Sequence, residues 1–272
     1  MPVSVSRRSL LIGATIVAAT AATTVPAASA ATSHPKPTVV LVHGAFADAS
    51  GWAEVTRKLQ RDGYPVLAPA NPLRGVEADS AYLSSVLQTV PGPIVLVGHS
   101  YGGFVITNAA TGNPNVKALV YVAAFAPDQG DTVFTLQTRF PGSKLGQDAL
   151  DIRPYPLPDG STSYDGYVKA AVFRDVFAGD LPATTTATMA ASQRPSDVHT
   201  LEQPAGPAAW KTIPSWFLIA RNDNLIPTDA QRFMADRAGG HRVEVNASHV
   251  AMISKPGVCA DLIRAAARAT TR

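Results

Sequence analysis

The residue best suited to act as a nucleophile is Ser100, which lies in the motif Gly98-His99-Ser100-Tyr101-Gly102-Gly103. A buried-type apolar run over 94–97 precedes the motif, and a helical pattern over 104–110 follows it. This context predicts a sharp strand-to-helix turn that strains the backbone of Ser100 and presents its Oγ above a sheet. Gly98 and Gly102 have no Cβ to collide across such a turn. Without its strand and helix, the motif could equally be part of a glycine-rich loop.

A serine hydroxyl is a weak nucleophile and needs a neighbouring base. Of the six histidines, His249 is the best candidate, because it lies in a loop between a predicted strand over 242–245 and a predicted helix over 256–269. That loop should open at the same edge of the sheet as the serine turn. The other histidines are expected in a linker, in structural loop motifs, in the middle segment or at the start of a strand: His34, His43, His99, His199 and His241.

The base in turn needs a carboxylate that fixes its tautomer and stabilises the imidazolium. Asp223 follows a predicted strand over 216–220, and the chain order Ser100, Asp223, His249 is the order of α/β-hydrolases. Asp128 is the alternative acid, since it follows the preceding predicted strand over 116–123. We favour Asp223, and whether Asp128 shares the role stays open.

Two backbone N–H groups are expected to bind the oxyanion that forms during attack on a carbonyl. One is that of Tyr101, directly after the nucleophile and at the start of a helix. The other is that of Ala45, in the turn His43-Gly44-Ala45-Phe46 after the predicted strand over 38–42. Gly44 allows a sharp turn there, although a His-Gly pair alone would indicate no more than a turn.

Strands and helices alternate along most of the chain, which predicts a parallel sheet with right-handed crossovers. We assign residues 31–126 and 208–272 to this core. The intervening segment 127–207 is rich in Pro, Gly, Asp, Ser and Thr and is too long for a plain loop. It is predicted to form a cap over the carboxyl ends of the strands, with helices near 167–177 and 184–191.

Taken together, these motifs resemble those of the small bacterial α/β-hydrolases related to plant methylesterases and hydroxynitrile lyases. The resemblance covers most of the chain from Thr38 onward, is weakest in the cap, and rests on 42–46, 98–103, Asp223 and 247–252. It implies an α/β-hydrolase fold: a mostly parallel sheet that lacks the first two strands of larger hydrolases, with a helical cap inserted between two strands.

The resemblance also narrows the chemistry. The lyases carry a Thr after the first-strand turn and a Lys after the catalytic His, whereas this chain has Ala45 and Val250 there. Both differences favour a carboxylesterase-type serine hydrolase that works through an acyl-enzyme. A lactonase, a hydroxynitrile lyase, a cofactor-free haloperoxidase-like enzyme and a non-catalytic ligand-binding protein remain alternatives. Aromatic residues of the cap favour small to medium esters with an apolar or aromatic part.

The composition fits one large core: 46% of the 272 residues are hydrophobic and 16% are charged. No basic stripe is present, so nucleic acid is not expected as a partner. The expected partner is a small-molecule ester, no metal or cofactor is expected, and the oligomeric state is unknown. Cys259 is the only cysteine, so no internal disulfide can form, and its thiol is expected to be buried and inert.

The first 30 residues read as a twin-arginine signal peptide. Arg7 and Arg8 precede a short apolar run over 10–22, and Ala28-Ser29-Ala30 offers a cleavage site. The run is shorter and less apolar than a membrane span, so no stable membrane insertion is expected after cleavage. The protein is therefore expected to be secreted. Of the 23 basic residues two lie in this segment, which leaves 21 against 20 acidic residues in the mature chain.

Overall fold

The computed structural model describes residues 35–270. The signal peptide expected over residues 1–30 therefore lies outside the described residues. Within the described part, no helix combines the length and the hydrophobicity required to cross a membrane.

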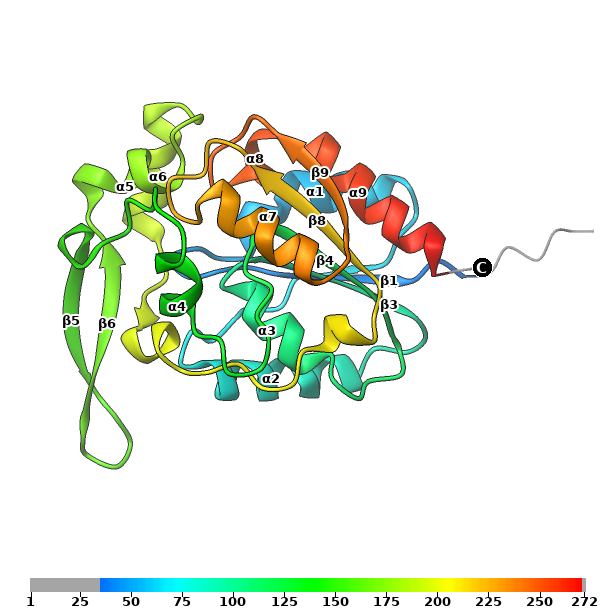
Figure 1. Ribbon diagram of the computed structural model, residues 1–272, viewed down its shortest axis with the longest axis horizontal. Helices are drawn as coiled ribbons and strands as arrows, with labels where there is room; N and C mark the ends of the chain where they lie inside the picture. Colours follow the sequence, from blue (N-terminus) through cyan, green and yellow to red (C-terminus); the bar gives the residue numbers. More distant parts are fainter. Residues whose placement is uncertain (1–34, 271–272) are drawn as a thin grey trace, which may run out of the picture. The chain divides into compact units, whose positions relative to one another are not determined.

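The core of the fold is a six-stranded sheet in which every neighbouring pair is parallel. Its spatial order is β2-β1-β3-β4-β8-β9 (Figure 1). The strands are β1 (Thr38–Val42), β2 (Val66–Leu67), β3 (Ile94–Ser100), β4 (Val116–Ala124), β8 (Ser215–Ala220) and β9 (His241–Val245). This order brings the carboxyl ends of β1, β3, β8 and β9 to one edge, where ligands bind in open α/β sheets.

Helices cover both faces of the sheet. Figure 1 shows α2 (Val76–Gln88) and α3 (Gly102–Ala109) on one face, and α1 (Ala53–Arg61) and α9 (Pro256–Ala269) on the other. A further helix, α7 (Thr228–Arg237), connects β8 to β9. The helix predicted over 256–269 is confirmed to the residue. The predicted α/β fold, with its mostly parallel sheet, is thus confirmed.

The central strands are buried on both faces, as their continuous apolar sequences predict. All residues of β3 and β8 are buried, and so are four of the five residues of β1. Cys259 on α9 is part of this core, and burial raises the pKa of its thiol, in agreement with the expected inert role. The rigid sheet therefore fixes the strand ends from which the functional loops start.

The chain between β4 and β8 forms the cap. It contains the expected helices, α5 (Ala170–Phe177) and α6 (Ala183–Ser192), and a shorter one, α4 (Val133–Thr138). It also contains an antiparallel sheet that the sequence analysis missed, made of β5 (Leu150–Pro156), β6 (Thr162–Val168) and β7 (Ser196–Asp197). The helix expected from residue 167 begins only at Ala170, because Tyr167 and Val168 pair with β5.

The two connections of the cap lie side by side. Gly130 N–H donates to the carbonyl of Ala205 (2.9 Å), and Ala205 N–H donates to the carbonyl of Asp131 (2.8 Å). We call this pair of backbone hydrogen bonds the neck of the cap.

Candidate active site

Ser100 is the last residue of β3, and α3 begins two residues later at Gly102. Its φ of 52° lies in the left-handed region, which is rare and strained for a residue with a side chain. The strain expected from the motif is confirmed. The glycines are needed for the expected reason: a Cβ on Gly98 would lie 2.7 Å from the carbonyl O of Gly102, and one on Gly102 would lie 2.7 Å from that of Val42.

The turn after β1 approaches the same serine closely. A Cβ added to Gly44 would lie 2.6 Å from the Cβ of Ser100 and 3.2 Å from its Oγ. Glycine at this position therefore lets the loop that carries Ala45 pass directly over the serine. Ala45, Ser100 and Tyr101 line one small cavity of about 20 Å³. The structure thus brings the two residues expected to supply the oxyanion donors to the expected nucleophile.

His249 and Asp223 are joined by a hydrogen bond. His249 Nδ1 lies 2.8 Å from Asp223 Oδ2, and both side chains are fully buried. The carboxylate also accepts from the N–H groups of Leu225 (2.8 Å) and Ile226 (2.9 Å), and from Gln231 Nε2 (2.9 Å). Because four donors hold the carboxylate, its orientation toward the imidazole is fixed. The expected partner of His249 is the one that the structure places beside it.

The other ring nitrogen of His249 is free. Nε2 is buried and has no hydrogen-bond partner in the part of the chain that the structure describes, so it does not bond Ser100 Oγ here. The backbone carbonyl of His249 accepts from His99 Nε2 at 2.9 Å, which ties the histidine loop to the residue before Ser100. Hydrogen bonds between a base and its nucleophile are often long in ligand-free enzymes and shorten when substrate binds. The geometry therefore leaves Nε2 available as a proton acceptor beside the serine turn.

His99 and His43 hold loops, as expected. Both are fully buried, and burial lowers the pKa of His43 and lowers that of His99 well below its ordinary value. His43 Nε2 accepts from the N–H of Asn71 (2.9 Å), while Asn71 Nδ2 donates to the carbonyl of His43 (3.0 Å). A neutral His99 adds no positive charge next to His249, whose ring centroid lies 4.7 Å away.

Asp128, the alternative acid, has a different partner. Its carboxylate forms an ion pair with Lys211 (2.6 Å) and accepts from the N–H of Gln129. The hydrogen bond from Lys211 lowers the pKa of Asp128. The structure therefore does not bring Asp128 to His249. Within residues 35–270, no group of three or more His, Cys, Asp or Glu side chains is arranged to hold a metal ion.

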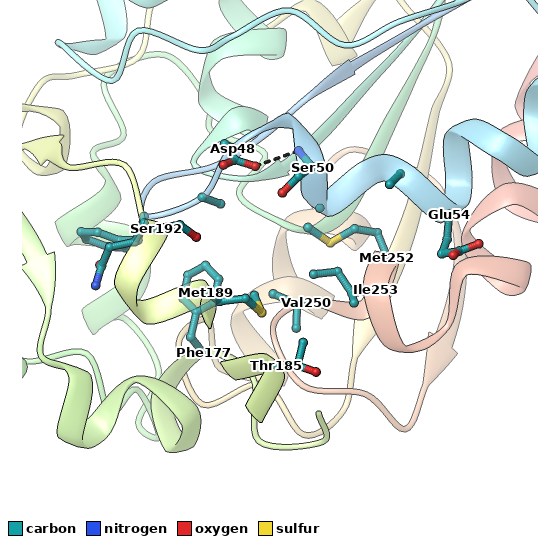
Figure 2. Close-up of a pocket in the computed structure, with 15 residues that line it drawn as sticks. Asp48, Ser50, Glu54, Phe177, Thr185, Met189, Ser192, Val250, Met252 and Ile253 are labelled. Atoms are coloured by element: carbon teal, nitrogen blue, oxygen red, sulfur yellow. Dashed lines mark hydrogen bonds between the residues drawn. The ribbon is translucent and has the colours of Figure 1, made fainter. Parts of the chain in front are cut away.

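A second, wider cavity of about 230 Å³ is lined in part by Phe46, which also lines the small cavity at Ser100 (Figure 2). Figure 2 shows cap residues Phe177, Met189 and Thr185 on one side, and Val250, Met252 and Ile253, next to and within α8 (Ala251–Ser254), on another. Among the described residues, Asp48 and Glu54 are the charged ones that line it. The lining is thus mainly apolar, with acidic groups from the loop after β1 and from α1.

The aromatic residues of the cap only partly form this cavity. Phe177 and Met189 line it, and Phe177 also packs edge-on against His249, with ring centroids 5.1 Å apart. Phe134 and Tyr164 are exposed instead, at 61% and 46%. Several of the aromatic residues of the cap therefore pack within it or lie on its surface instead of lining the cavity.

Three residues that the sequence analysis did not single out contribute to the site. Gln231 orients Asp223, and its Oε1 accepts from the N–H of Ala220 (3.0 Å). Asp180 in the cap contacts Ser248, directly before His249. Phe46 lines both cavities. Only Phe46 carried a sequence signal, namely its position in the loop after the first strand.

Comparison with known proteins concerns the chain as a whole. The model described as "Alpha/beta hydrolase family" matches residues 39–262. The carbendazim hydrolyzing esterase of Nocardioides sp. is 34% identical over 110 residues, which cover 36% of this chain and 46% of that protein. Methylesterase 1 of Arabidopsis thaliana is 24% identical over 249 residues, 83% of this chain and 94% of its own.

Among solved structures, that of polyneuridine aldehyde esterase superimposes with a TM-score of 0.72 at 18% identity. The match covers 85% of this chain and 98% of that one. At this identity the likeness concerns the fold. The expected relation to plant methylesterases is confirmed at the level of sequence similarity.

Proposed function

This chain belongs to the alpha/beta hydrolase family, and on that basis we propose that it is a carboxylesterase-type serine hydrolase with Ser100 as nucleophile. The observation that carries the proposal is the buried hydrogen bond between His249 and Asp223. It leaves Nε2 of His249 without a partner, and the backbone of His249 is hydrogen-bonded to His99, directly before the strained Ser100. A buried imidazole with one nitrogen held by a carboxylate and the other unpartnered is arranged to accept a proton. Relatives named as esterases support this reading.

The reaction proceeds in two acyl-transfer steps. His249 Nε2 takes the proton of Ser100 Oγ as the oxygen attacks the ester carbonyl, and Asp223 stabilises the imidazolium. The N–H groups of Ala45 and Tyr101 bind the tetrahedral oxyanion, each lowering the barrier by about 3 kcal/mol. The alcohol leaves with the proton from His249. Water, activated by the same imidazole, then releases the acid from Ser100.

The preferred substrates are small to medium esters with an apolar or aromatic part. The wider cavity supports this choice, because thioether, aliphatic and phenyl groups make up most of its lining. Asp48 and Glu54 would repel an anionic substrate, so neutral esters are favoured. The volume of about 230 Å³ suits a group of small to medium size.

The protein acts outside the cytoplasm in this proposal, after removal of residues 1–30 as a twin-arginine signal. Support comes from the Arg7-Arg8 pair, the short apolar run and the Ala28-Ser29-Ala30 site. Replacing both arginines by lysine should retain the protein inside the producing cell. Recovery of the double variant in the culture medium at the wild-type level would contradict this route.

A fluorophosphonate probe tests the catalytic proposal, because it reacts covalently with an activated serine. The mature wild-type protein should be labelled at Ser100, as located by peptide mass, and should hydrolyse a chromogenic acetate ester. Ser100→Ala should lose both properties with an unchanged circular dichroism spectrum. A wild-type protein that is folded but neither labelled nor active on a panel of esters and lactones would refute the hydrolase assignment.

A further inference from the structure

The two cavities at the site share a single lining residue, Phe46. We propose that the Phe46 ring is a movable partition between them and that it determines the size of ester that reaches Ser100. This inference rests on the proposed esterase function and adds to it the residue that selects substrates by size.

The volumes show why such a partition matters. The cavity lined by Ala45, Ser100 and Tyr101 measures about 20 Å³, which is space for about one water molecule. It cannot hold the acyl part of any ester larger than the smallest. The wider cavity of about 230 Å³ has the necessary space, but Ser100 is not among its lining residues. A larger ester seated there reaches the hydroxyl only if the residue common to both cavities moves.

The backbone at Phe46 is fixed, so the ring is the part that can move. Its φ of 59° lies in the left-handed region, which a phenylalanine adopts only when its surroundings impose it. The loop is held on one side by His43, through Asn71, and on the other by Asp48, which accepts from the N–H of Ser50 (2.8 Å). Rotation about χ1 therefore displaces the ring while the neighbouring N–H of Ala45 keeps its place.

The wider cavity offers space into which the ring can swing. Met189 and Met252 line it, and unbranched thioether side chains adapt to a displaced neighbour more readily than branched ones. Phe46 itself is only 5% exposed, so protein atoms surround its ring almost completely in this structure. Small esters reach Ser100 with little displacement of the Phe46 ring. Bulky esters must displace the ring fully, and the free energy of this displacement adds to the barrier at every turnover.

Two methyl esters that share methanol as leaving group provide the test: methyl acetate and methyl 2-naphthoate, followed by acid release in a pH-stat. Phe46→Ala should raise the ratio of kcat/KM for the naphthoate over the acetate at least tenfold, and Phe46→Leu should give an intermediate rise, since small steric changes in a pocket change specificity by about 10- to 200-fold. Phe134→Ala is the matched control, because Phe134 is 61% exposed and lines neither cavity. It should leave the ratio unchanged.

Thr185→Trp covers the case in which Phe46→Ala fails to fold. Thr185 lies on an exposed face of α6 and lines the wider cavity, so the indole should fill that cavity and lower the naphthoate-to-acetate ratio. An unchanged ratio in either the Phe46 variants or Thr185→Trp would overturn the partition. Fluorophosphonate labelling of Ser100 distinguishes failure of the partition from failure of the esterase proposal. A labelled protein with an unchanged naphthoate-to-acetate ratio refutes only the partition, whereas an unlabelled wild type refutes the esterase function.

Discussion

Asp180 accepts two hydrogen bonds from Ser248, one from its backbone N–H at 3.1 Å and one from its hydroxyl. Asp180 belongs to the cap segment between α5 and α6, whereas Ser248 directly precedes His249. Burial alone would raise the pKa of the Asp180 carboxyl, but several hydrogen-bonding interactions, those with Ser248 among them, outweigh it and keep this pKa below its ordinary value. The cap is thus tied to the loop of the proposed base through a charged acceptor.

Asp180→Ala should lower kcat for a small acetate ester about five- to tenfold, because the histidine loop loses two hydrogen bonds to a carboxylate. KM should change little, since Asp180 lines neither cavity. Steady-state kinetics checks this split, with Asp159→Ala on the β5–β6 hairpin as the control that leaves both constants unchanged. A purely structural role would instead lower the amount of active protein and leave kcat per labelled site at the wild-type value.

Replacing the nucleophile by glycine and by alanine should separate catalysis from strain. Both variants lose turnover, but Ser100→Gly should be about 1 kcal/mol more stable than Ser100→Ala, because the φ of 52° costs a Cβ-bearing residue about 1–2 kcal/mol. Urea unfolding of the two inactive variants gives the difference. Equal stabilities, or a more stable alanine variant, would mean that the surroundings do not impose this strain.

The two aspartates should differ sharply on substitution. Asp223→Asn should lower kcat by about 10²- to 10⁴-fold, because an amide cannot stabilise the imidazolium as a carboxylate does. Asp128→Asn should cost less than about twofold, since it removes a partly exposed ion pair with Lys211 worth about 0–1 kcal/mol. Measurement of kcat for both variants shows which aspartate orients His249. A larger loss in Asp128→Asn would reassign the acid.

Acid should destabilise the protein through its buried neutral histidines. Burial lowers the pKa of His99 well below its usual range, so below about pH 6.5 the unfolded chain binds a proton there that the folded chain does not. Stability is therefore lost as the pH falls below about 6.5, by up to about 1.4 kcal/mol per pH unit for one such group.

His99→Gln removes this titration, and its amide can still donate to the carbonyl of His249. The loss of unfolding free energy between pH 7 and pH 5 should then be smaller than in the wild type by up to about 2 kcal/mol. Urea unfolding at both pH values measures it. Between pH 7 and pH 8 the two proteins should change in parallel, and an identical acid loss in both would show that another group dominates.

The sequence was sufficient to predict those parts of the fold that depend on a local pattern of residues. Short continuous apolar runs such as those of β3 and β8 indicate buried central strands, and α7 and α9 carry helical periodicity with a proline at or just before the first turn. The motif around Ser100 predicted its own backbone strain, because the glycine spacing that permits the turn is local. The positions of His249 and Asp223 followed from their places after parallel strands.

The cap was harder to predict because its structure depends on pairing rather than on periodicity. Most of β5 is exposed and contains Pro154 and Pro156, so it has neither the alternation nor the composition of a typical strand. Its partner β6 supplies the pairing that makes it a strand. Side chains such as Asp180 and Gln231 act through contacts 68 and 8 residues away, and nothing in their local sequence marks them.

The neck at Gly130, Asp131 and Ala205 makes the cap an exchangeable module. Its two backbone hydrogen bonds hold the departing and returning chains at a fixed short separation, so residues 131–205 could be replaced by the insert of a relative without redesigning the sheet. A graft of this kind would inherit the loop after β1, including Phe46. It would have to supply its own partners for the residues outside the cap that the present segment bonds, among them Ser248, Leu73, Asn224 and Leu225. Chimeras made at this splice point could therefore change substrate range while retaining the reactive centre.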